Sequence, residues 1–176
     1  MAWPDLTGVL SPLPWAVVGA AATRLYMPER ATRDLDVAVR AGDARDVRDR
    51  LSRAGFTQLG ELSIGGSSWR ATDGAEIDVI EGREEWWDDA LREAQANRDA
   101  SGLPILPLRH LVLMKLRSGR VQDIADVARM LGQADPGALD AVRALFRRYA
   151  PADLGDLESL AALGRLETEE PREPAI

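Results

Sequence analysis

The stretch WAVVGAAATRLYMPERATRDLDVAV, residues 15–39, contains the local signals from which the rest of the chain can be placed. Its first four residues are apolar and meet Gly19, after which good helix formers continue to Tyr26. This order predicts a strand, a tight turn and a helix. Beyond a loop that contains Pro28, residues 34–39 alternate polar and apolar side chains, as a half-buried strand does. The stretch therefore predicts a strand, turn and helix that lead into a second strand.

Two carboxylates lie close together on the second of these strands, at Asp34 and Asp36. Side chains alternate between faces along a strand, so both carboxylates project from the same side. Like charges repel at this spacing, and bound divalent cations or arginine partners usually offset that repulsion; Mg²⁺ prefers carboxylate oxygen. Alone the pair carries little weight, because 29 acidic residues among 176 produce about five such pairs by chance.

A third carboxylate lies on a strand further along the chain. Asp73-Gly74 separates two short extended runs, which is a strong hairpin signal and places Asp78 on the outgoing strand. On that strand Asp78 shares a face with Glu76, whereas the apolar side chains of Ile77 and Val79 project from the other face. If this strand pairs with the one at residues 34–39, three carboxylates meet on one rim.

The order of these features resembles the DNA polymerase beta-like nucleotidyltransferase superfamily. Within it, the chain is most similar to the small bacterial branch of abortive-infection toxin-type and minimal nucleotidyltransferases. The resemblance covers roughly residues 15–131. It implies an α+β fold with a nucleotidyltransferase-type mixed β-sheet flanked by helices, followed by a C-terminal helical segment. The motifs that carry it are Gly19-Ala20, Arg30-x-Thr32-x-Asp34-x-Asp36, Asp78, Lys115 and residues 120–126.

The resemblance also implies a reaction, in which a nucleoside monophosphate passes from an NTP to an acceptor hydroxyl and pyrophosphate is released. Two Mg²⁺ ions, with Mn²⁺ as a substitute, would be held by the catalytic carboxylates Asp34, Asp36 and Asp78. In that family a second glycine or a serine commonly follows the first glycine, whereas the alanine here keeps the N–H and brings no hydroxyl. The implied nucleotide-binding residues are Gly19, Ala20, Arg30, Thr32, Arg33, Lys115 and Asp123.

Lys115 and Asp123 also have ordinary structural explanations. Lys115 is the only lysine in the chain and lies on the apolar stripe of a helix predicted over residues 108–116, where it either extends to solvent or has an anionic partner. Asp123 and Asp126 share a face of the next predicted helix, residues 121–131. Without the resemblance, that face is best explained as solvated, with nearby arginines as partners.

The composition indicates one globular unit. We expect an α/β core in residues 1–106, a helical part in residues 107–166 packed on it, and a disordered tail in residues 167–176. The chain has no cysteine, no apolar stretch near the roughly 20 residues that span a bilayer, and no signal-peptide pattern at its start. These features predict a cytoplasmic protein without a membrane partner. The net charge of −7 disfavours a broad nucleic-acid-binding surface.

Three hypotheses about function remain open at this point. The first is an active enzyme whose acceptor is an RNA 3′ end, a protein hydroxyl or a small molecule, with a cognate toxin or antitoxin protein as a further partner. The second is a catalytically degenerate nucleotidyltransferase fold that binds a partner protein. The third is an α+β interaction protein whose carboxylates are incidental. The adjacent Trp86 and Trp87 are better explained as core residues than as a base-stacking platform, and the lone His110 as structural.

Overall fold

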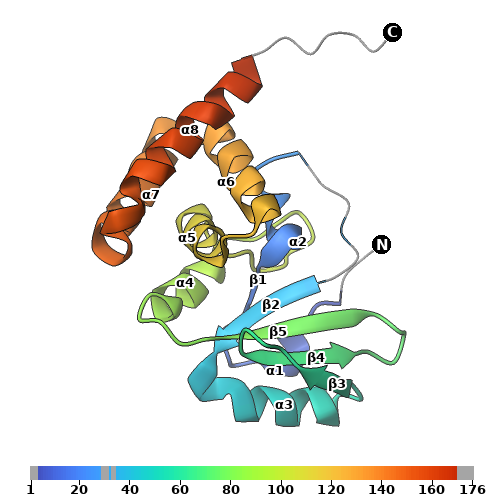
Figure 1. Ribbon diagram of the computed structural model, residues 1–176. Helices are drawn as coiled ribbons and strands as arrows, with labels where there is room; N and C mark the ends of the chain where they lie inside the picture. Colours follow the sequence, from blue (N-terminus) through green and yellow to red (C-terminus); the bar gives the residue numbers. More distant parts are fainter. Residues whose placement is uncertain (1–3, 29–31, 33–34, 170–176) are drawn as a thin grey trace, which may run out of the picture. The chain divides into compact units, whose positions relative to one another are not determined.

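The computed structural model describes residues 4–28, residue 32 and residues 35–169 (Figure 1). The chain divides into two compact units. The first, called here the sheet unit, comprises Met1–Leu25 and Arg30–Pro107, and the second, the helical unit, comprises Tyr26–Glu29 and Leu108–Ile176.

The sheet unit is built on one five-stranded mixed sheet (Figure 1). The strands lie in the order β1-β2-β5-β4-β3; β2 and β5 are parallel, and the other neighbours are antiparallel. Helices flank this sheet, so the expected α+β fold with a mixed sheet is confirmed. The strands are β1 Ala16–Val17, β2 Leu35–Arg40, β3 Thr57–Glu61, β4 Gly66–Arg70 and β5 Glu76–Gly82.

One face of the sheet forms the main core of this unit, because buried apolar side chains alternate with more exposed ones along β5 and, apart from the buried Ala38, along β2. Helix α3, Ala44–Arg53, follows the short 3-10 helix η1, Ala41–Asp43, and buries Val47 and Leu51. The Asp73-Gly74 turn joins β4 to β5 as the sequence predicts, with Gly74 at a φ of 89°. The buried residues of the core face are Leu35, Val37, Val39, Trp69, Ile77 and Val79.

The remaining helices of the sheet unit are α1 Thr7–Leu10, α2 Gly19–Thr23 and α4 Trp87–Ala94. The rings of Trp86 and Trp87 stack with centroids 4.2 Å apart and are almost fully buried, which confirms them as core residues. Asp43 precedes α3, and its residue type predicts a helix cap there, but this prediction is wrong. It belongs to η1 and its backbone is helical (φ −93°, ψ −3°) rather than extended, so its side chain makes no cap hydrogen bond.

The helical unit consists of α5 Leu108–Ser118, α6 Val121–Gln133, α7 Pro136–Tyr149, the 3-10 helix η2 Pro151–Asp153, and α8 Leu154–Glu169. Aspartate followed by proline at residues 135–136 predicts a helix start. The structure confirms it, because Asp135 Oδ1 accepts a hydrogen bond of 2.8 Å from the Ala138 N–H. Helices α6 and α8 touch through their backbones. A Cβ atom added at Gly164 would lie 1.9 Å from the carbonyl oxygen of Ala128, so no larger residue fits this crossing.

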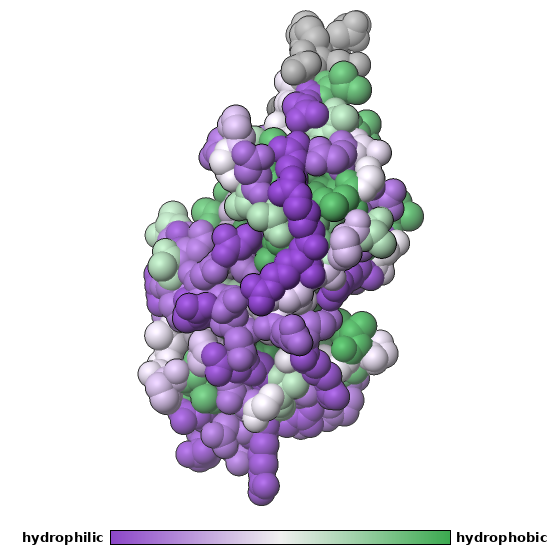
Figure 2. All heavy atoms as spheres, turned by 90° about the vertical axis from the view of Figure 1, so that its left-hand side faces the viewer, coloured by the Kyte–Doolittle hydropathy of each residue, from purple (hydrophilic) through white to green (hydrophobic). Residues whose placement is uncertain are grey.

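One face of the molecule is drawn with all its heavy atoms in Figure 2, and it is mainly polar. Figure 2 shows the face on the left-hand side of Figure 1, where hydrophilic side chains predominate and apolar ones form small patches. No helix in the described part of the chain is both long and apolar enough to cross a membrane. Among the described residues, the large apolar side chains exposed by half or more are Ile64, Val121 and Leu166.

Candidate functional site

Two carboxylates are brought together by the parallel pairing of β2 and β5, in which Asp36 lies opposite Asp78. Both side chains are half-buried and project from the face opposite the apolar core face. Neighbouring strands lie about 4.8 Å apart, so these carboxylates are close neighbours. The expectation that the two strands pair is confirmed. Asp34, the third carboxylate of the sequence hypothesis, lies outside the described residues.

Gly19 packs directly against Asp36. Its φ is 62°, and a Cβ atom placed there would lie 1.9 Å from Asp36 Oδ2 and 2.8 Å from Asp36 Cγ. Only glycine tolerates both this backbone conformation and this approach. Helix α2 begins at Gly19 and has five residues, so it contributes few aligned peptide dipoles to a triphosphate. Because Gly19 has no side chain, the Asp36 carboxylate has space beside it. Nucleotide contact by Gly19 and Ala20 stays a prediction.

Ser68 is a site residue that the sequence reasoning missed. It lies opposite Asp78 in the antiparallel β4–β5 pair, and its hydroxyl donates a hydrogen bond of 2.5 Å to Asp78 Oδ1. This bond fixes one carboxylate oxygen of Asp78. Counting outward from the Asp73-Gly74 turn would have identified Ser68, because the residues of a tight hairpin pair symmetrically about the turn.

A cavity of about 390 Å³ adjoins Asp78 on the β3–β4 side. Two acidic side chains at this cavity form ion pairs with arginine: Glu61 with Arg48 at 2.8 Å, and Glu76 with Arg70 at 2.7 Å. The Arg48 hydrogen bond lowers the pKa of Glu61 below its ordinary value. The cavity is lined by Leu59, Gly60, Glu61, Ser68, Glu76, Ile77 and Asp78.

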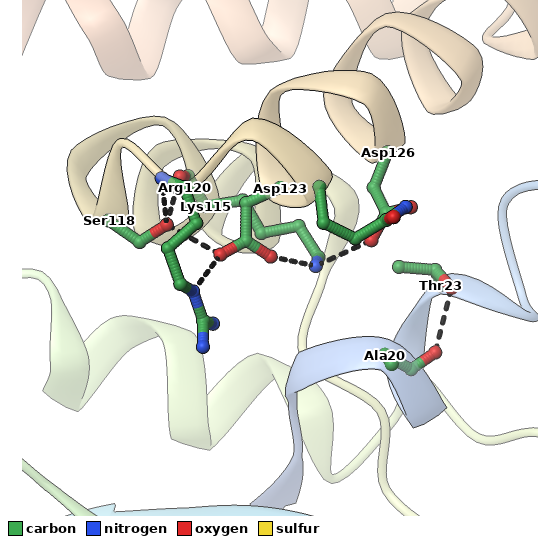
Figure 3. A network of polar contacts seen from close by, with 8 residues as sticks. Ala20, Thr23, Lys115, Ser118, Arg120, Asp123 and Asp126 are labelled. Carbon is green, nitrogen blue, oxygen red and sulfur yellow. Dashed lines mark hydrogen bonds and ion pairs between the residues drawn. The ribbon is translucent and has the colours of Figure 1, made fainter.

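In the helical unit, Lys115 lies between two aspartates (Figure 3). Its Nζ donates to Asp123 Oδ1 at 2.6 Å and to Asp126 Oδ2 at 2.9 Å, and the three side chains are 1%, 5% and 0% exposed. Ser118 Oγ and Arg120 Nε donate to the other oxygen of Asp123. The alternative that the two aspartates lie on a solvated face is therefore wrong, because both need the partner that Lys115 supplies on another helix.

The pKa of Asp123 lies below its ordinary value of 3.8. Burial acts to raise this pKa, but hydrogen bonds from Lys115 and Ser118 outweigh it. An ammonium group has three N–H donors, and two of those of Lys115 are used within the cluster. Nucleotide contact by Lys115 and Asp123 stays a prediction, for which at most one donor of the lysine is left.

The other residues of the sequence hypothesis are less well placed. Thr32 is half-buried and lies outside helices and strands, whereas Arg30 and Arg33 are not among the described residues. Within residues 4–28, 32 and 35–169, no group of three or more histidine, cysteine, aspartate or glutamate side chains is arranged to hold a metal ion. The predicted three-carboxylate metal site includes Asp34 and is therefore not tested.

No protein-family model matches the chain, and no curated protein matches its sequence significantly. Solved structures match it distantly, and nucleotidyltransferases recur among them. The solution structure of the antibiotic-resistance factor ANT(2'')-Ia is 16% identical over 89% of this chain and 84% of that chain, with a TM-score of 0.45. Its crystal structure with adenylyl-2''-tobramycin is 15% identical over 89% of each chain, with a TM-score of 0.46.

A candidate nucleotidyltransferase from Thermotoga maritima, TM1012, is 17% identical over 64% of this chain and 78% of that chain, with a TM-score of 0.45.

Proposed function

We propose that this protein is a metal-dependent nucleotidyltransferase, which moves a nucleoside monophosphate from an NTP to an acceptor hydroxyl and releases pyrophosphate. The observation that carries the proposal is the position of Asp36 opposite Asp78 on parallel strands, with the Gly19 backbone packed against Asp36. Transfer of this type depends on charge neutralisation and positioning more than on covalent chemistry. Two adjacent half-buried carboxylates beside the Gly19 turn are suited to neutralising charge and positioning the substrates.

The residues present fit Mg²⁺. Carboxylate oxygen is its preferred protein ligand, and Asp78 keeps its Oδ2 for that purpose while Ser68 occupies Oδ1. The sequence pattern predicts that Asp34 shares a face with Asp36. Asp34, Asp36 and Asp78 would together hold two Mg²⁺ ions, or Mn²⁺ in their place. When bound, the ions would neutralise the phosphate charge.

The chain's own residues have distinct roles in this proposal. The acceptor oxygen attacks the α-phosphorus, an oxygen–phosphorus bond forms, the bond to the bridging oxygen breaks, and pyrophosphate leaves. Asp78 accepts the proton of the acceptor hydroxyl. The N–H groups of Gly19 and Ala20 bind phosphate. The resemblance adds Lys115 as a contact of the β- and γ-phosphates, with Arg30, Thr32, Arg33 and Asp123 as secondary candidates.

Three finer parts of the proposal rest on the sequence alone. A place in the small abortive-infection branch, a role in a toxin–antitoxin pair with a cognate protein partner, and a cytoplasmic location follow from the resemblance and the composition. In a labelling experiment, metal-dependent NTP binding without transfer would support a protein partner.

The test uses each of the four α-labelled NTPs with Mg²⁺ or Mn²⁺ and a cell extract, for the wild type, Asp36→Asn and Asp78→Asn. Asp73→Asn is the matched control, because it makes the same chemical change on the exposed turn that leads into β5. We expect label transfer by the wild type and Asp73→Asn, and none by the other two variants. Saturable metal-dependent NTP binding without transfer would instead support the degenerate partner-binding protein, and neither binding nor transfer would support incidental carboxylates.

A further inference from the structure

Asp78 has different surroundings on its two sides, because β5 lies between β2 and β4 in the sheet. On the β2 side are Asp36 and the Gly19 turn, where the nucleotide is proposed to bind. On the β4 side is Ser68. In phosphoryl-type transfer the attacking and leaving oxygens lie roughly in line, on opposite sides of the phosphorus. A nucleotide on the β2 side therefore leaves the β4 side for the acceptor.

The β4 side of Asp78 holds the 390 Å³ cavity, of which Asp78 and Ser68 form part of the lining. Pockets for small molecules commonly have volumes of about 300–1,000 Å³. The cavity thus has the size for a small molecule, and it lies where an acceptor hydroxyl would reach the Asp78 carboxylate.

The charges at this cavity disfavour phosphate groups. Its described lining residues include three acidic residues and no lysine or arginine. Glu76 and Asp78 share the face of Ser68, whereas Glu61 pairs with Ser67 on the opposite face and bonds Arg48 through its carboxylate. The guanidinium groups of Arg48 and Arg70 are paired with Glu61 and Glu76, respectively. The end of a nucleic acid would bring negatively charged phosphates to a cavity whose described lining residues include acidic side chains but no cationic one, so the two would repel each other. A neutral or cationic compound meets no such repulsion.

We infer that this cavity binds the acceptor, and that the acceptor is a small hydroxyl compound without phosphate groups rather than the end of a nucleic acid. The inference rests on the proposed function. In the reaction, the hydroxyl oxygen of this compound forms the new bond to the α-phosphorus, its proton passes to Asp78, and pyrophosphate leaves.

Gly60 offers a way to block the cavity. It lies opposite Ser68 in the β3–β4 pair, so a side chain at this position projects on the same face as the serine hydroxyl. A Cβ atom placed at Gly60 meets no atom within 4 Å, and its φ is outside the left-handed region. Gly60→Trp can therefore fold and fill the cavity. Ile64→Trp is the matched control, because it lies in the β3–β4 turn, is 72% exposed and does not line the cavity.

The experiment separates a cell extract by ultrafiltration into a small-molecule filtrate and a macromolecular fraction, and measures label transfer from α-labelled NTP to each. We expect the wild type to label a compound of the filtrate that resists nuclease and protease. Gly60→Trp should raise the amount of filtrate needed for half-maximal transfer by about 10-fold or more, with an unchanged KM for NTP. Ile64→Trp should match the wild type.

Each other outcome has a distinct meaning. Label found only in the macromolecular fraction, and released by nuclease or protease, would overturn the inference and leave the proposed function intact. A labelled filtrate with unchanged half-saturation in folded Gly60→Trp would show that the acceptor binds elsewhere. If Gly60→Trp does not fold, the fractionation of the wild-type product still decides the class of acceptor. No label in either fraction would remove the proposed function, and the inference with it.

Discussion

Each unit of the chain brings two aspartates together, but it does so in a different way. In the helical unit, Asp123 and Asp126 are almost fully buried and share the ammonium group of Lys115. In the sheet unit, Asp36 and Asp78 are half-buried, and Asp78 receives its hydrogen bond from the neutral hydroxyl of Ser68. The buried ammonium group of Lys115 neutralises the first pair, whereas the second pair is only half-buried. The comparison therefore assigns a structural role to the first pair, whereas the second pair is the one proposed to act in the reaction.

The largest effect is expected from Asp36→Asn and Asp78→Asn. Each should reduce nucleotide transfer by about 1,000-fold or more, because several kcal/mol of transition-state stabilisation depend on the bound metal. The melting temperature should stay equal or rise, since one of two like charges is removed. Single-turnover transfer and thermal denaturation measure the two quantities. A parallel fall of activity and melting temperature would place Asp36 and Asp78 in the same structural class as Asp123.

Lys115→Met tests the other side of the comparison. It leaves two buried carboxylates without their cation, and we expect the helical unit to lose about 3–5 kcal/mol of unfolding free energy. All five tryptophans lie between residues 3 and 87, so their fluorescence does not follow this unit. Amide hydrogen exchange in α5 and α6 measures it directly.

The triple variant Lys115→Met/Asp123→Asn/Asp126→Asn serves as the control for the lysine substitution. It removes both buried charges together with their partner and should recover most of the lost stability. Normal exchange rates in Lys115→Met with weaker NTP binding would contradict the structural role and support the phosphate contact predicted from the resemblance.

The elements that sequence could predict are those encoded in short local patterns. Residue alternation identified the strand of Asp36, and the Asp73-Gly74 turn identified the hairpin that carries Asp78. Asp135 followed by proline marked the start of α7. Each of these signals is completed within a few residues, so no knowledge of distant contacts was needed.

The elements that sequence could not predict depend on side chains from different segments. The burial of Asp126 depends on Lys115, which lies 11 residues earlier on another helix, so the periodicity of α6 alone suggested a solvated face. The cavity beside Asp78 needs three strands at once. Asp34 lies outside the described residues, so its place beside Asp36 stays a prediction.

A smaller effect is expected at Ser68, which holds Asp78 without being charged. Ser68→Ala should lower kcat by about 10-fold with little change in the KM for NTP, because it removes a hydrogen bond to a charged group. Ser68→Thr keeps the hydroxyl and should restore most of kcat. Ser67→Ala is the matched control, since Ser67 is buried on the opposite face and accepts a hydrogen bond from Trp69 Nε1. It should lower stability and leave kcat unchanged; equal kcat values for the two alanine variants would remove the positioning role of Ser68.

The smallest effect concerns pH and a single carboxyl group, that of Asp123. Burial opposes its ionisation, but Lys115 and Ser118 hold its pKa below 3.8 in the folded chain. On acidification the unfolded chain therefore takes up this proton first, so the stabilisation is complete above pH 3.8 and is lost as pH falls through the folded pKa. The unfolding free energy of the helical unit should consequently decline less steeply with acid in Asp123→Asn than in the wild type. Hydrogen exchange in α6 at a series of acidic pH values measures both slopes, and identical slopes would mean that Lys115 does not stabilise the charged form of Asp123.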